Sequence, residues 1–148
     1  MPAQKFRNPI TAARGLKVDR VFKANADLSA CQYRFVSPGA VDGEIVGANG
    51  ASNPFPIGIL QNAPAASGDA IVRMFGESLL HVPANASTLV FGDFVSSTGC
   101  GGGKHSGASG VIFGRVISGS VASGGTATCT LTVLLNSIVP SGSLNAAS

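Results

Sequence analysis

The most reactive side chains of this sequence gather in one glycine-rich stretch, TGCGGGKHSG, at residues 98–107. Cys100 and His105 could bind a metal ion, and Gly103-Lys104 could belong to a phosphate-binding loop. A Walker loop requires G-x-x-x-x-G-K followed by Ser or Thr, so that amides and lysine hold phosphates and the hydroxyl binds magnesium. Here Thr98 replaces the first glycine and His105 replaces the hydroxyl residue. The stretch therefore does not fit a nucleotide site.

Metal binding and nucleophilic catalysis lack partners as well. A structural zinc site needs four ligands and a catalytic site about three. Beyond Cys100 and His105, the soft ligands are His81 and the distant Cys31 and Cys129. No G-x-S-x-G elbow occurs, and no carboxylate pair is spaced for acid and base roles. We expect no metal, no cofactor and no enzymatic activity.

The composition is unusually poor in charge. Charged residues make up 11% of the 148 residues and apolar residues 45%, whereas an ordinary soluble domain is about 25% charged. Such a surface is typical of a subunit whose apolar faces are covered by copies of itself or by a partner. A monomer coated with Ser, Thr, Asn and Gly is the alternative.

The net charge of +3 is unevenly distributed. Residues 1–34 hold seven basic side chains against two carboxylates, and the rest of the chain holds three against five. A basic leading segment suggests an arm that docks on an acidic protein or nucleic-acid surface, or simply a solvated terminus. The sequence shows no hydrophobic signal core and no apolar run of about 18 residues. We therefore expect synthesis in a cytosol and no membrane partner.

Alternating apolar and polar residues predict strands throughout. The clearest run is TATCTLTVLL at residues 126–135, where the period of two marks an amphipathic strand. The other expected strands are 15–23, 31–37, 55–61, 70–76, 78–82, 89–96 and 111–118. We predict an all-β fold: a single small β-barrel or β-sandwich of about eight short strands with an extended N-terminal arm. The predicted division is an arm and first strand at 1–27, the β domain at 28–135 and a tail at 136–148.

An internal repeat accompanies this pattern. Residues 57–75 align without a gap on residues 113–131, at a constant offset of 56. Upstream, Phe35-Val36-Ser37 matches Phe94-Val95-Ser96 at an offset of 59. Each unit is expected to run as a strand ending in FVS, a glycine-rich loop, a strand with a central glycine, a turn and a strand. Residues 98–107 then correspond to the loop PGAVDGEIVGANGASN and are expected to form a mobile hairpin tip, with Lys104 and His105 facing solvent or a neighbour.

Four phrases in this order resemble the small capsid decoration, or cement, proteins of tailed bacteriophages. The phrases are CQYRFVSPG, PFPIGILQNAPAASGDAIVRMFGES, VPANASTLVFGDFVSSTGCGGG and GVIFGRVISGSVASGGTATCTLTV. The resemblance covers roughly residues 28–135. It implies a β-rich, non-enzymatic virion protein, commonly trimeric, made in the host cytoplasm and bound to major capsid protein on the outer surface of the head.

The N-terminal arm lies outside the resemblance, so its role is inferred from charge. We expect its basic and aromatic side chains to meet carboxylates of the shell. The candidate contact residues are Lys5, Phe6, Arg7, Arg14 and Lys17. Two other interpretations remain open: another all-β virion component such as a tail or adaptor protein, and a nucleic-acid-binding module that uses the arm, although no specific nucleic acid is expected.

Overall fold

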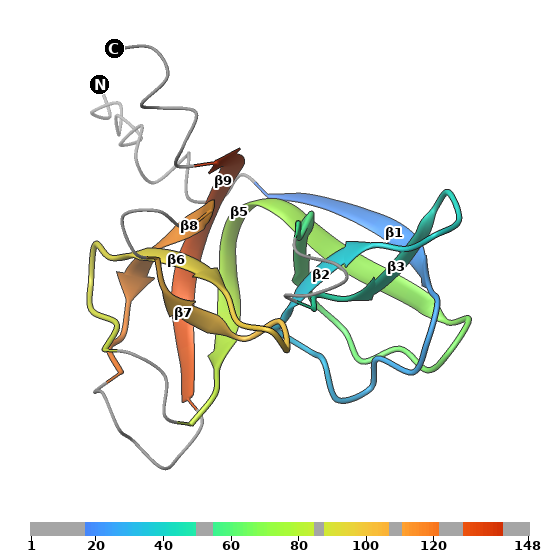
Figure 1. Ribbon diagram of the computed structural model, residues 1–148, viewed down its shortest axis with the longest axis horizontal. Coiled ribbons are helices and arrows are strands. Elements are labelled where there is room, and N and C mark those ends of the chain that lie inside the picture. The colour runs from blue at the N-terminus through green and yellow to red at the C-terminus, as the bar shows by residue number, and fades with distance from the viewer. Residues whose placement is uncertain (1–16, 50–54, 85–87, 107–110, 122–128, 141–148) are drawn as a thin grey trace, which may run out of the picture.

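In the computed structural model, which describes residues 17–49, 55–84, 88–106, 111–121 and 129–140, the described chain consists of strands and connecting turns (Figure 1). None of these residues forms a helix with the length and apolarity needed to cross a membrane. The all-β prediction is confirmed, and the described residues contain nine strands. They are β1 (Val18–Ala24), β2 (Phe35–Pro38), β3 (Glu44–Gly47), β4 (Gly58–Leu60), β5 (Asp69–Val82), β6 (Phe94–Ser97), β7 (Gly103–His105), β8 (Val111–Ser118) and β9 (Cys129–Pro140).

The first five strands close into a barrel. The hydrogen-bonded order is β1-β3-β2-β4-β5, and β1 also pairs with β5, which leaves no free edge. The β1–β3 pair is parallel and the others are antiparallel. Inside the barrel lies a small apolar core made of Ala24, Leu28, Val36, Ile45, Leu60, Ala70 and Val72.

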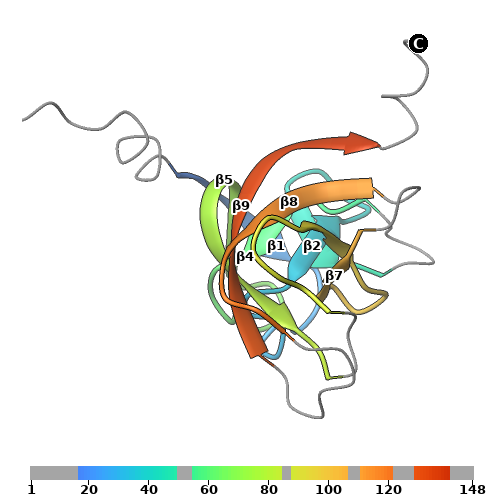
Figure 2. The same ribbon diagram turned by 90° about the vertical axis from the view of Figure 1, so that its left-hand side faces the viewer.

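The long strand β5 joins this barrel to a second sheet. Its first half pairs with β1 up to Phe75, and from Gly76 onward it pairs with β9. Gly76 has a φ of 98°, a backbone conformation that favours glycine, at the point where the partner changes. The second sheet has the order β5-β9-β8-β6-β7. Seen from its end, this sheet curves in front of the barrel (Figure 2).

The strands β2 and β4 form a layer between two cores. Val36 and Leu60 face the barrel interior, whereas their neighbours Phe35 and Ile59 belong to the core of the second sheet. All four side chains are almost fully buried. Because successive strand residues point to opposite faces, two adjacent residues on each of these strands contribute to both cores.

The predicted repeat is present in the strand pairing. The first unit comprises β1 to β4 and the first half of β5. The second unit comprises the second half of β5, then β6 to β8, and the first half of β9. In the first unit β2 pairs with β3 and β4, and β4 pairs with β5. In the second unit β6 pairs with β7 and β8, and β8 pairs with β9.

The two units also agree residue by residue. Val36 pairs with Gly58 in the first unit, and Val95 pairs with Gly114 in the second. The backbone amide of Ala48 donates to Phe35 at 3.2 Å, and that of Ser106 donates to Phe94 at 2.9 Å. The turns before β2 and β6 match too, and their central residues, Tyr33 and Gly92, both have positive φ.

The gap-free alignment is wrong in the last strand. Leu60 of β4 pairs with Val72 of β5, and Val116 of β8, the equivalent of Leu60, pairs with Val133 of β9. This places β9 at an offset of 61 from β5 rather than 56. Five more residues thus separate Val116 from its partner Val133 than separate Leu60 from its partner Val72. The sequence comparison hid this because glycine, alanine and serine fill both connections.

Some expected strand boundaries are also wrong. The segments 70–76 and 78–82 form one continuous strand, because Gly76 bends β5 without interrupting it. The FVS triplets begin β2 and β6 rather than ending them, and each is preceded by a hydrogen-bonded turn. The short strands β3 and β7 lie inside the two glycine-rich segments that were expected to be loops. The expected arm falls mostly in residues 1–16, outside the described residues, and the division into domains stays a prediction.

Candidate interaction surfaces

The glycine-rich stretch connects the second unit to the first. Gly101 accepts a hydrogen bond from the backbone amide of Phe35 at 2.7 Å, and Cys100 accepts one from the Arg34 guanidinium at 3.2 Å. An added Cβ would lie 2.6 Å from the Phe35 carbonyl oxygen at Gly101, 2.7 Å from Pro83 at Gly102 and 2.6 Å from Leu80 at Gly103. Because these three glycines lack side chains, the Phe35 backbone and the side chains of Pro83 and Leu80 can pack directly against this segment.

The expected mobile tip is thus a docked segment of the second unit. All three glycines are buried, because Leu80, Pro83 and the Phe35 backbone lie against them. Lys104 and His105 follow in β7, and both are exposed, as the sequence predicted. Among the described residues, no three His, Cys, Asp or Glu side chains gather into a group that could hold a metal ion.

Next to this contact, Arg34 and His81 form a polar bridge between the units. The Arg34 guanidinium lies 3.1 Å from Nε2 of His81, and the His81 backbone amide donates to Tyr33 at 2.7 Å. Because a guanidinium can only donate, Nε2 must accept, which assigns a neutral ring with its proton on Nδ1. Burial, together with the Arg34 charge, lowers the pKa of His81. This histidine is structural, as its position within a strand suggested.

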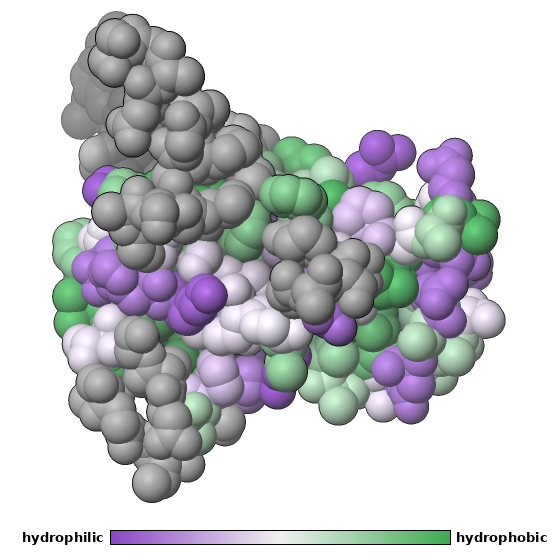
Figure 3. Space-filling model, viewed as in Figure 1, coloured by the Kyte–Doolittle hydropathy of each residue, from purple (hydrophilic) through white to green (hydrophobic). Residues whose placement is uncertain are grey.

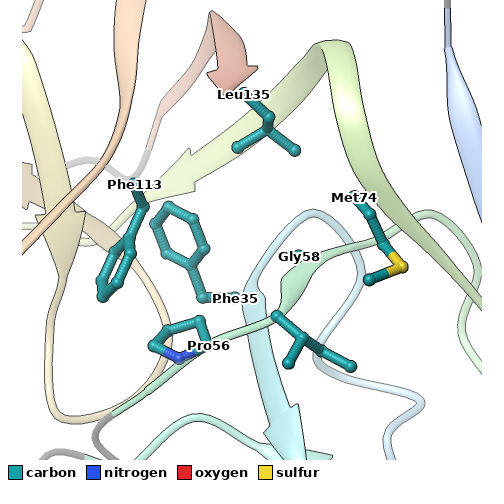
Figure 4. Close-up of a pocket in the computed structure, with 7 residues that line it drawn as sticks. Phe35, Pro56, Gly58, Met74, Phe113 and Leu135 are labelled. Carbon is teal, nitrogen blue, oxygen red and sulfur yellow. The ribbon is translucent and has the colours of Figure 1, made fainter. Parts of the chain in front are cut away.

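A small apolar cavity lies where the two cores meet. It has a volume of about 10 Å³ and is lined by side chains from both units (Figure 4). Phe35 and Phe113 lie side by side there, with ring centroids 5.2 Å apart, while Met74 lies on the far side of Gly58. A cavity needs roughly 10–15 Å³ to hold one water molecule. The volume of this cavity lies at the lower limit of that range and its lining is apolar, so we interpret it as a packing gap between the units.

A group of exposed apolar side chains lies along β1 and β5. We call it the arm-side face, because the chain enters β1 here from Lys17. Val21 pairs directly with Ile71 on the same side as Asp19 and Arg73, and Val18 pairs with Phe75 beyond a register shift. The exposed apolar residues of this face are Val18, Val21, Ile71, Phe75 and Leu79.

An ion pair is embedded in this apolar face. Asp19 accepts two hydrogen bonds from the Arg73 guanidinium, at 2.8 and 2.9 Å. These bonds lower the pKa of Asp19 and raise that of Arg73, while partial burial opposes both shifts. Beside the pair, an open hollow of about 310 Å³ extends from Lys17 to Leu79.

Only one of the five predicted contact residues, Lys17, lies within the described residues. Lys17 is exposed and lies directly before β1, on the rim of the hollow in the arm-side face. Lys5, Phe6, Arg7 and Arg14 lie outside the described residues. Sequence reasoning did not identify the arm-side face: in VDRVFK of β1, period-two alternation places Asp19 and Val21 on one side of the strand and Val18 on the other.

No protein-family model and no curated protein sequence matches this chain. Among solved structures, it is similar to the crystal structure of the head fiber gp8.5 N base of bacteriophage phi29. The similarity has a TM-score of 0.54 at 18% sequence identity, and it covers 82% of this chain and 95% of that one. At this identity the comparison establishes a shared fold.

Proposed function

We propose that the chain is a structural protein of a phage head, bound to the outer surface of the shell as a decoration, or cement, protein. The observation that carries this proposal is the shared fold with the base of a phage head fiber, which extends over 95% of that base. Independently, the sequence phrases quoted above resemble decoration proteins. Its major partner would be the capsid protein, and copies of the chain would associate as trimers.

The surface of the first unit suits such a role. The arm-side face carries five exposed apolar side chains near the Asp19–Arg73 ion pair, and the basic N-terminal segment immediately precedes β1 in the sequence. Apolar side chains surrounded by charged groups are typical of protein–protein contacts. A ligand that binds only the assembled shell stabilises it by mass action. Modest interfaces repeated over many copies would therefore be sufficient.

The shared fold with a fiber base favours one further candidate, in which the domain anchors a fiber to the head. Electron microscopy of native particles distinguishes the two. A decoration protein gives compact density of this domain's size on the shell, whereas a fiber base gives density that continues outward. Density on the tail or neck instead would support the tail or adaptor interpretation.

The role of the basic segment is tested by reversing its charge. We expect a variant with Lys5→Glu, Arg7→Glu, Arg14→Glu and Lys17→Glu, or deletion of residues 1–14, to lower occupancy on heads made without the wild-type protein. The reason is that each exposed ion pair contributes about 0.2–1 kcal/mol and is screened by salt. The control exchanges Lys for Arg and Arg for Lys at the same positions and should bind normally. Unchanged occupancy of the deleted chain would contradict an arm-mediated contact.

A further inference from the structure

The internal repeat identifies a face that is covered in one unit and exposed in the other. In the first unit, Phe35 and Ile59 pair across β2 and β4 and point away from the barrel, into the second core. The outside of the first unit is therefore a docking face within the molecule. This face is covered by the core of the second unit, in which Phe113 packs against Phe35.

In the second unit, the equivalent positions are Phe94 and Arg115, which pair across β6 and β8 in the same register. Here nothing in the described chain covers them: Phe94 is 43% exposed and Arg115 is exposed. The preceding turn adds Val90 and Phe91, of which Phe91 is 76% exposed. We call Val90, Phe91, Phe94 and Arg115 the end patch. Apolar surface is visible at the left edge of this end of the molecule, beside hydrophilic surface (Figure 3).

The end patch is held in place by its own contacts. The Arg115 guanidinium stacks 4.5 Å from the centroid of the Phe94 ring, and its Nε donates to the Gly92 carbonyl at 2.9 Å. The Asp93 carboxylate accepts from the Val90 amide at 2.9 Å. A preorganised surface loses little side-chain entropy on binding. Aromatic and arginine side chains are also the residues that most often dominate interface energies.

We propose that the end patch is a docking surface for the shell protein, which would cover Phe91 and Phe94 with apolar side chains and place a carboxylate on Arg115. This inference rests on the proposed function. Within the described part of the chain no ion pair involves Arg115, so its charge is available to a partner. A guanidinium on an aromatic ring, flanked by apolar side chains, matches an apolar surface with an acidic group.

A second copy of the chain is a poor fit to this patch. The internal contact works because the second unit is open beside β7, where the segment carrying Phe35 enters. In another copy that opening is already filled by its own Phe35, and the first unit is closed because Lys23 of β1 pairs with Glu44 of β3. Patch-to-patch pairing would bring two Arg115 cations together.

The test measures cosedimentation of purified protein with expanded heads that were assembled without it. Phe91→Ser should weaken binding about tenfold or more, as expected for an interface hot spot. Arg115→Glu should weaken it further, and Arg115→Lys should recover part of the loss because it keeps the charge. The matched control is Phe55→Ser, which removes another exposed phenylalanine of the first unit and should bind like wild type. Thermal melting should be unchanged by Phe91→Ser, since the side chain is mostly exposed.

The outcomes separate this inference from the proposed function. Failure of the wild-type chain to bind the heads would overturn both. Normal binding by wild type, Phe91→Ser and Arg115→Glu alike would leave the proposed function standing and overturn the end patch as its contact. A Phe91→Ser variant that changes the mass of the free protein in sedimentation equilibrium would show that the patch joins copies of the chain, which also overturns the inference.

Discussion

At the scale of single residues, the contacts that join the two units involve side chains that a sequence motif search would assign to chemistry. Cys100 and His81 were candidate metal ligands, yet Cys100 contributes a carbonyl to Arg34 and His81 contributes a ring nitrogen to the same guanidinium. Spacing alone argued against a nucleotide or zinc site. The actual role of Gly101 could not be predicted, because it depends on Phe35, far away in the sequence.

The neutral state of His81 predicts a pH dependence of stability. Its pKa in the folded protein lies below the ordinary value of 6.5 because burial and Arg34 disfavour the cation. The unfolded chain therefore binds the proton more strongly. Neutral His81 therefore contributes to the free energy of unfolding in full above pH 6.5. The contribution is lost as the pH falls toward the pKa of His81 in the folded protein.

Urea denaturation between about pH 5 and 8 measures this effect. We expect His81→Gln to reduce the decline in unfolding free energy on acidification, with a slope change of at most about 1.4 kcal/mol per pH unit. The exposed His105 supplies the control, since His105→Gln should retain the wild-type decline. An identical pH profile for His81→Gln and wild type would rule out His81 as its source.

At the scale of elements, period-two alternation located most strands, because one face of each strand is buried and the other is not. The short strands β3 and β7 escaped prediction because three or four residues carry too little periodicity, and glycine makes up part of each. The repeat predicted their equivalence nonetheless. What it could not supply was the five-residue shift of β9, which depends on strand pairing rather than on residue identity.

The glycines of β4 and β8 should be equivalent in energy as well as in position. A Cβ on Gly58 would clash with the Arg73 carbonyl, and one on Gly114 would lie 2.6 Å from the Leu134 carbonyl. Arg73 and Leu134 occupy the same position of their units once β9 is shifted, because they pair with the equivalent residues Ile59 and Arg115. We expect Gly58→Ala and Gly114→Ala each to lower the unfolding free energy by about 1–3 kcal/mol, because rigid backbone must move.

Chemical denaturation of the purified variants measures this loss, with Gly99→Ala as the control. Gly99 has no atom within 4 Å of an added Cβ, so its replacement should change stability by less than about 0.5 kcal/mol. A destabilised Gly58→Ala beside a neutral Gly114→Ala would mean that the two hairpins are not equivalent.

At the scale of the whole molecule, the two units share a strand and a layer, so neither buries its core alone. β5 supplies a wall to both units, and Phe35 of the first unit belongs to the core of the second. We therefore expect one cooperative unfolding transition rather than two. Phe35→Ala should lower the stability of both units together, by about 3–5 kcal/mol.

Two probes placed in different units test this coupling. Amide hydrogen exchange in β1 reports opening of the first unit, and exchange in β8 reports opening of the second. In wild type the most protected amides of both strands should exchange with the same free energy, and Phe35→Ala should lower both by the same amount. Val21→Ala is the matched control, because Val21 lies on the exposed side of β1 and contacts neither core. If Phe35→Ala lowered protection in β2 and β4 but left β8 unchanged, the second unit would be independently stable, and the shared layer would be a contact between two domains rather than a common core.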